Sequence, residues 1–139
     1  MTRSKKAIIN FILVALMGVV AVVWAGGRSE SDKTKEVDGP YRDYSEDAFL
    51  EAAEMKRVLF FHASWCPNCR RAEKDIKQNL AEIPEDVVIF KTDYDSERTL
   101  KRKYGITYQH TFVYVDDEGE AITKWSGGGA EDIIDRVEG

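Results

Sequence analysis

The chain has 139 residues, which is enough for one domain of ordinary size and too few for two. It is 43% hydrophobic and 32% charged, which excludes a disordered or fibrous chain. The formal net charge of −5 argues against a nucleic-acid partner, because phosphates would repel an acidic protein. Two cysteines are too few for a scaffold held together by disulfides.

The amino-terminal segment differs from the rest of the chain. Three basic residues among the first six precede an uncharged apolar run. As a helix rising ~1.5 Å per residue, residues 7–24 would span about 27 Å, close to the ~30 Å hydrocarbon core of a bilayer. This length favours an uncleaved signal anchor over residues 1–25. The small residues around Ala25 leave a signal peptide cleaved near that position as the alternative.

The basic flank also predicts on which side of the membrane the domain lies. Because positive charge stays on the cytoplasmic side, we expect a single-pass protein of the cell membrane with an extracytoplasmic domain. After cleavage it would instead be secreted or periplasmic. Such compartments tolerate disulfides. Residues 26–40 are rich in Gly, Ser and charge, which is typical of a flexible linker, so the domain is expected over residues 41–139.

Helices and strands are expected to alternate along residues 41–139. Apolar spacing, capping residues and turn residues mark their limits. In the first half of the domain we expect a helix from Ser45 to about Arg57, a strand over 58–63, a helix from about Pro67 to Leu80 and a strand over 87–90. In the second half we expect a helix from Ser96 to about Lys103 closed by Gly105, a strand over 111–115, a turn over 116–119, a strand over 120–125 and a short helix after 127–129. This order predicts an α/β fold: a central mixed sheet of about four strands with helices on both faces.

Two cysteines lie where a buried strand gives way to a helix. A helix N-terminus offers unpaired N–H groups and about half a positive charge, which favours a thiolate at Cys66. Pro67 falls at the first helical position, where its missing N–H costs nothing. Cys69 lies one turn further along the helix. We expect Cys66 to form a mixed disulfide with a substrate and Cys69 to resolve it.

Residues 41–139 resemble the thioredoxin family. The resemblance rests on the strand over 58–63 followed by Trp65-Cys66-Pro67-Asn68-Cys69, on residues 90–95, and on residues 104–106, five residues before Thr111. It implies a thioredoxin-like fold and dithiol–disulfide exchange by the redox-active pair Cys66–Cys69, with no further cofactor. The surroundings of this pair would be Trp65, Pro67, Asn68, Gln109, His110 and Thr111.

The sequence departs from the family at two positions. Phe60 stands where the family has a buried acid that helps to take the proton of the resolving cysteine, so Cys69 needs another base or water. His110 stands where the family has a cis-proline. A cis bond before a non-proline residue costs ~2.5–4 kcal/mol, so the Gln109–His110 bond is expected to be trans. Near the sulfurs, His110 would stabilise the Cys66 thiolate or accept its proton.

Two other functions remain open on the sequence. Cys66, Cys69 and His110, with or without His62, would hold Cu(I) or Zn(II) or bridge an iron–sulfur cluster. A lone histidine in a strand such as His62 is otherwise expected to be a hydrogen-bonded core residue. The third hypothesis, after a redox enzyme and a metal-binding protein, is a non-catalytic adaptor with an inert disulfide. A redox enzyme of this kind, whether it reduces or oxidises its substrate, also needs an electron-transfer partner.

Overall fold

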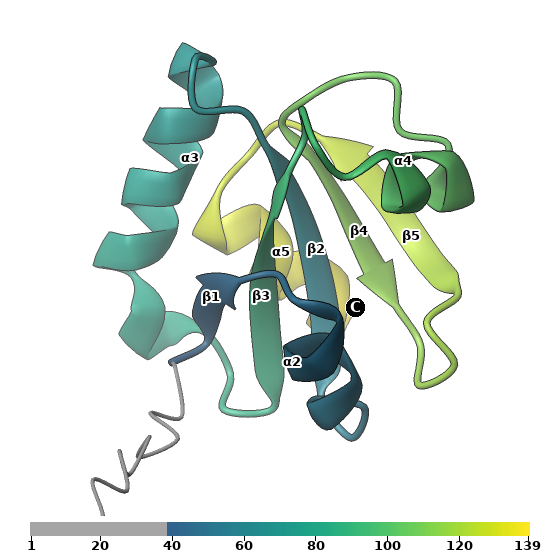
Figure 1. The fold of residues 1–139 in the computed structure, drawn as a ribbon. Helices are drawn as coiled ribbons and strands as arrows, with labels where there is room; N and C mark the ends of the chain where they lie inside the picture. The colour runs from purple at the N-terminus through teal and green to yellow at the C-terminus, as the bar shows by residue number, and fades with distance from the viewer. Residues whose placement is uncertain (1–38) are drawn as a thin grey trace, which may run out of the picture. The chain divides into compact units, whose positions relative to one another are not determined.

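Five strands form one mixed sheet in the computed structural model, in the order β1-β3-β2-β4-β5 (Figure 1). β1 runs parallel to β3, and β3 parallel to β2, whereas β4 lies antiparallel to both β2 and β5. The strands are β1 (Tyr41–Asp43), β2 (Lys56–His62), β3 (Val87–Asp93), β4 (Thr111–Val115) and β5 (Ala121–Ser126). β2 therefore lies at the centre of the sheet, with a partner strand on each side.

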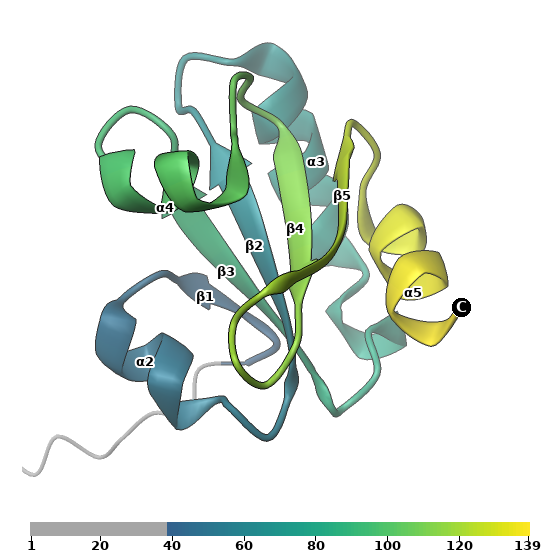
Figure 2. The same ribbon diagram turned by 90° about the vertical axis from the view of Figure 1, so that its right-hand side faces the viewer.

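Helices cover both faces of the sheet (Figure 2). They are α2 (Glu46–Glu51), α3 (Pro67–Gln78), the 3₁₀ turn η1 (Leu80–Glu82), α4 (Arg98–Tyr104) and α5 (Ala130–Glu138). β2 divides its apolar side chains between the two faces, as the period of a strand requires. Val58 and Phe60 pack with α3 and α5, while Leu59 and Phe61 pack with α2 and α4. The predicted α/β class and mixed sheet are confirmed.

The structure describes residues 39–139. The expected signal anchor or signal peptide over residues 1–25 lies outside them, as does all but the last part of the expected linker. Within residues 39–139, no helix is both long enough and apolar enough to cross a bilayer.

The predicted helix from Ser45 to Arg57 was wrong at its carboxyl end, and the sheet has five strands rather than about four. The Ser45 hydroxyl caps α2 as expected, accepting from the N–H of Ala48. The helix nevertheless ends at Glu51, because the backbone from Lys56 onward pairs with β3 as a strand. The additional strand is β1, whose three residues pair in parallel with β3.

The ends of α3 and α4 also differ slightly from their predicted positions. α3 ends at Gln78, and the apolar pattern that suggested Leu80 continues into η1. α4 begins at Arg98 without a side-chain cap at Glu97. The residue expected as its cap, Ser96, instead donates its N–H to Oδ1 of Asp93, the last residue of β3, at 3.4 Å. Gly105 closes α4 in the left-handed conformation, φ +60°, as predicted.

Arg57 is a charged residue in the interior of the fold. Its side chain is 1% exposed and donates to the carbonyls of Phe49, Asp116 and Asp117, which belong to α2 and to the turn between β4 and β5. Its guanidinium also lies over the Phe49 ring, 4.3 Å from the centroid. The cation thus joins two chain segments that are distant in sequence.

We predict that Arg57→Met lowers the free energy of unfolding by about 3 kcal/mol, because the carbonyls lose a charged donor. Urea unfolding followed by circular dichroism measures the change. Lys56→Met is the matched control: its ion pair with Asp86 is partly exposed, and its loss should change stability by less than about 0.5 kcal/mol. Equal stability of the two variants would show that the Arg57 contacts contribute little.

Candidate active site

Cys66 is the N-cap residue of α3. Its extended backbone turns the chain from the end of β2 into the helix, and Pro67 occupies the first turn. The Cys66 sulfur accepts a hydrogen bond from the backbone N–H of Cys69 at 3.4 Å. Both side chains are buried and both are free thiols, with Cys66 5% and Cys69 0% exposed. One backbone donor of the helix N-terminus is therefore directed at the sulfur of Cys66.

The two thiols have opposite electrostatic environments. Burial acts to raise the pKa of Cys66, but hydrogen bonds from Cys69, from the backbone of Asn68 and from the side chain of Gln109 outweigh it and lower the pKa. Burial raises the pKa of Cys69 to about 11, and the neighbouring Cys66 adds to this increase. At neutral pH, Cys66 is the more readily ionised sulfur, and Cys69 keeps its proton. This is the division expected of an attacking and a resolving cysteine.

Trp65 and Asn68 lie at the surface around Cys66. The Trp65 side chain is 57% exposed, and its indole N–H donates to Oδ2 of Asp95 at 2.9 Å. Asn68 accepts from the guanidinium of Arg71 at 3.3 Å, one turn along α3. The indole is therefore held in one orientation although most of its surface faces solvent.

The loop before β4 brings Gln109 and His110 to the sulfurs. The Gln109 side chain acts to lower the pKa of Cys66, and the His110 backbone acts to lower the pKa of Cys69, so both residues lie near the thiols. Residues 39–139 contain no cis peptide bond, so the bond before His110 is trans, as expected. The His110 N–H donates to the carbonyl of Phe61 at 2.8 Å, which a proline at this position could not do.

His110 also contacts the glycine loop before α5. Its carbonyl accepts from the N–H of Gly127 at 2.9 Å, and its Nε2 lies 3.0 Å from the carbonyl oxygen of Gly128. The residue adopts φ +57°, a left-handed conformation that is uncommon for a non-glycine residue. Thr111, the next residue, is buried, and its hydroxyl donates to the carbonyl of Tyr108 at 2.9 Å. The whole loop is thus fixed by backbone contacts on both sides.

His62 belongs to a different set of contacts from the other candidate metal ligands. It is 4% exposed, and its Nε2 lies 3.1 Å from Oε2 of Glu73 on α3. Within residues 39–139 no group of three or more His, Cys, Asp and Glu side chains is arranged to hold a metal ion. The described part of the chain therefore gives the metal-binding alternative no geometric support.

Glu73 is the residue of this region that the sequence reasoning missed. Its Oε1 accepts from Lys77 at 2.9 Å and from Lys91 at 3.0 Å, while its Oε2 faces His62. Burial acts to raise the pKa of Glu73, but the two lysines outweigh it and lower the pKa to about 2. The available signal was its spacing, since Glu73 follows Cys69 by four residues and so lies on the same face of the helix.

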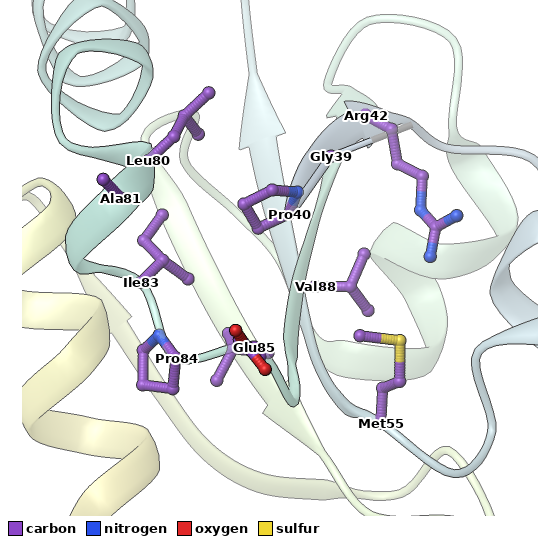
Figure 3. Close-up of a pocket in the computed structure, with 11 residues that line it drawn as sticks. Gly39, Pro40, Arg42, Met55, Leu80, Ala81, Ile83, Pro84, Glu85 and Val88 are labelled. Atoms are coloured by element: carbon purple, nitrogen blue, oxygen red, sulfur yellow. The ribbon is translucent and has the colours of Figure 1, made fainter. Parts of the chain in front are cut away.

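A cavity of about 390 Å³ lies at the other end of the sheet, where β3 begins (Figure 3). Its walls are largely apolar and include Pro40, Leu80, Ile83 and Val88. It contains neither cysteine nor histidine side chains. The chemistry of the described residues is therefore gathered at the carboxyl end of β2, away from this cavity.

Comparison with known proteins identifies the family of the domain. The family model described as Thioredoxin matches residues 42–138. Thioredoxin H4 of Arabidopsis thaliana is 30% identical over 80 residues, which are 58% of this chain and 66% of that protein. Thioredoxin H3 of the same plant is 36% identical over 92 residues, 64% of this chain and 76% of that protein. The chain thus spans about two thirds to three quarters of the length of these two relatives.

A longer relative and a solved structure extend the comparison. A protein disulfide-isomerase of Schizosaccharomyces pombe is 26% identical over 121 residues, 86% of this chain but 30% of that protein. The crystal structure of Fasciola hepatica thioredoxin is similar with a TM-score of 0.57 and 29% identity, covering 67% of this chain and 88% of that one. On the match of its domain, the chain belongs to the thioredoxin family of thiol–disulfide oxidoreductases.

Proposed function

We propose that this chain exchanges dithiols and disulfides with protein substrates through Cys66-Pro67-Asn68-Cys69, on the extracytoplasmic side of a membrane. The observation that carries the exchange chemistry is the sulfur of Cys66 at the start of α3. It accepts the N–H of Cys69 and has a lowered pKa, beside a second thiol that keeps its proton. The thioredoxin and protein disulfide-isomerase relatives support the same chemistry.

The exchange proceeds in two substitutions at sulfur. The Cys66 thiolate attacks one sulfur of a substrate disulfide, that S–S bond breaks, and the other substrate sulfur leaves as a thiolate. Cys69 then loses its proton and attacks the Cys66 sulfur, which releases the second substrate thiolate and forms the Cys66–Cys69 disulfide. Two electrons pass from the chain to the substrate. The reverse sequence oxidises a substrate dithiol, and a separate dithiol or disulfide partner must restore the starting state.

Exposed aromatic side chains beside Cys66 support a polypeptide as the substrate. Trp65 is 57% and Tyr108 is 71% exposed. Trp65 precedes Cys66 directly, and Tyr108 precedes Gln109, whose side chain acts to lower the pKa of Cys66. Large exposed aromatic rings are typical of surfaces that bind proteins. We infer that these rings contact the substrate chain on either side of its disulfide.

Replacing each cysteine in turn should block a different step of the exchange. Cys66→Ser removes the attacking sulfur, so the reduction of insulin disulfides by dithiothreitol should fall to the uncatalysed rate. Cys69→Ser keeps the attacking sulfur but cannot resolve, so it should accumulate a mixed disulfide with the substrate, which mass spectrometry of the intact chain detects. Full turnover by Cys66→Ser, or an inert disulfide in the wild-type chain, would favour a non-catalytic adaptor.

The location is proposed from the sequence alone. The basic residues before the apolar run over 7–24 support an anchor with an extracytoplasmic domain. We expect the chain to remain with membranes after alkaline carbonate extraction, and Cys66 to react with a membrane-impermeant thiol reagent before the membrane is broken. Cys66→Ser is the control for labelling. Labelling of Cys66 only after lysis would place the domain on the opposite side, and a soluble chain shortened near Ala25 would indicate a cleaved signal peptide.

A further inference from the structure

His62 and Glu73 form a buried titratable pair that the two substitution steps do not use. His62 lies at the end of β2 and is 4% exposed, and Glu73 is 16% exposed on α3. The His62 Nε2 lies 3.1 Å from Oε2 of Glu73, within ion-pair distance but outside the alignment of a hydrogen bond. A buried imidazole nitrogen without a hydrogen bond is uncommon and requires a reason.

Glu73 belongs to α3, the helix that begins at the two cysteines, and His62 faces it from the end of β2. Glu73 follows Cys69 by one helical turn and shares its face. Phe60 packs in the same buried cluster as Cys69, and its ring centroid is 5.4 Å from that of His62. The imidazole therefore lies between Phe60 and Glu73, on the side of the sheet that Cys69 faces.

The charges around His62 leave it as a neutral base supported by an anion. Burial lowers the pKa of His62, so the ring is neutral near pH 7. Glu73 opposes this shift and is ionised, because its own pKa is about 2. Lys77 on α3 and Lys91 on β3 also lower the pKa of His62, and Asp93 on β3 raises it. Both lysines bind Oε1 of Glu73, and Tyr41 on β1 also faces this carboxylate. Oε2 lies 3.1 Å from the imidazole, where it can stabilise an imidazolium.

The resolving step requires such a base. Cys69 is fully buried with a pKa of about 11, and the side chain in the central strand beside it, Phe60, accepts no proton. When Cys66 is bound to a substrate sulfur it carries no charge, so one of the effects that raise the pKa of Cys69 disappears. The proton of Cys69 must still leave a site from which water is largely excluded.

We propose that His62, oriented by Glu73, accepts the proton of Cys69 in the resolving step, directly or through one water molecule. The inference rests on the exchange function proposed above. As the S–H bond of Cys69 breaks, its sulfur forms the bond to the Cys66 sulfur, the bond from Cys66 to the substrate breaks, and the substrate leaves as a thiolate. The imidazolium pairs with Glu73 and then returns its proton to water.

A water-accessible cavity supplies the exit for that proton. It measures about 350 Å³ and is lined by His62 together with Ser64, Lys91 and Asp93. The ring thus lies between the buried face of α3, where Cys69 is found, and a polar cavity on the surface. This is the placement required of a group that transfers a proton from a buried thiol to solvent.

The test uses the reduced full-length chain and 5,5′-dithiobis(2-nitrobenzoate) in a stopped-flow spectrometer. The first thionitrobenzoate released reports the attack of Cys66. The second reports resolution by Cys69, at a rate independent of reagent concentration. His62→Gln keeps a donor toward Glu73 but accepts no proton. Near pH 7 it should slow the second release at least about 10-fold and leave the first unchanged. The deficit should shrink as the pH rises toward the pKa of Cys69, about 11.

Three further variants make the result decisive. Glu73→Gln, which covers the case that His62→Gln does not fold, should slow the second release by a smaller factor with the same pH trend. Lys74→Gln, an exposed charge removed from the next position of α3, should change neither phase. Identical second phases in the wild-type chain, His62→Gln and Glu73→Gln would overturn the proposal. A second phase slowed by His110→Gln and not by His62→Gln would overturn it in favour of His110.

The same experiment separates this proposal from the function on which it rests. If the wild-type chain releases no second equivalent by an intramolecular step, the exchange function itself fails. If the wild-type chain resolves normally and the His62 and Glu73 variants do as well, only the proton acceptor has been wrongly assigned.

Discussion

The site depends on one hydrogen bond, from the backbone N–H of Cys69 to the sulfur of Cys66 at the start of α3. This bond exists because β2, buried at the centre of the sheet, delivers Cys66 in an extended conformation to the N-cap position. Ala72 and Ile76, buried below it, hold the helix against the sheet. Since the same helix turn buries Cys69, a single piece of backbone lowers the pKa of one thiol while burial raises that of the other. The difference in pKa between the two thiols is therefore a property of the strand–helix junction.

Much of the fold was predictable because its signals are local. The apolar run of β2, the proline at the start of α3, the glycine that closes α4 and the limits of β4 all follow from short stretches of sequence. The errors concern elements that distant residues determine. β1 has three residues and exists as a strand only beside β3. Arg57 carries a charge and was predicted at the end of a helix. It lies instead in β2, where its guanidinium donates to carbonyls of α2 and of the turn between β4 and β5.

The candidate site likewise has features that local sequence predicts and features that depend on distant contacts. The cysteine pair and its place at a helix start could be predicted, because both depend on a short motif after an apolar strand. The environment of His110 could not, because it depends on contacts with Phe61 and with the glycine loop before α5. Glu73 was also missed, although its spacing from Cys69 was visible. Glu73 is notable for its contacts with Lys91 on β3 and His62 on β2. The pattern of residues along the sequence does not show contacts between such distant segments. Phe60 lies beside His62, and the acidic group that faces His62, Glu73, lies on α3 rather than on the central strand.

The most direct test of the central claim is an ultraviolet titration of the thiolate absorbance of the reduced chain near 240 nm, with Cys66→Ser and Cys69→Ser to assign each step. The account predicts two separate ionisations: that of Cys66 at a pH below the ~8.5 of an ordinary cysteine, and that of Cys69 near 11. A single transition in which both sulfurs ionise together at the ordinary value would show that the start of α3 does not stabilise the anion, and would contradict the account.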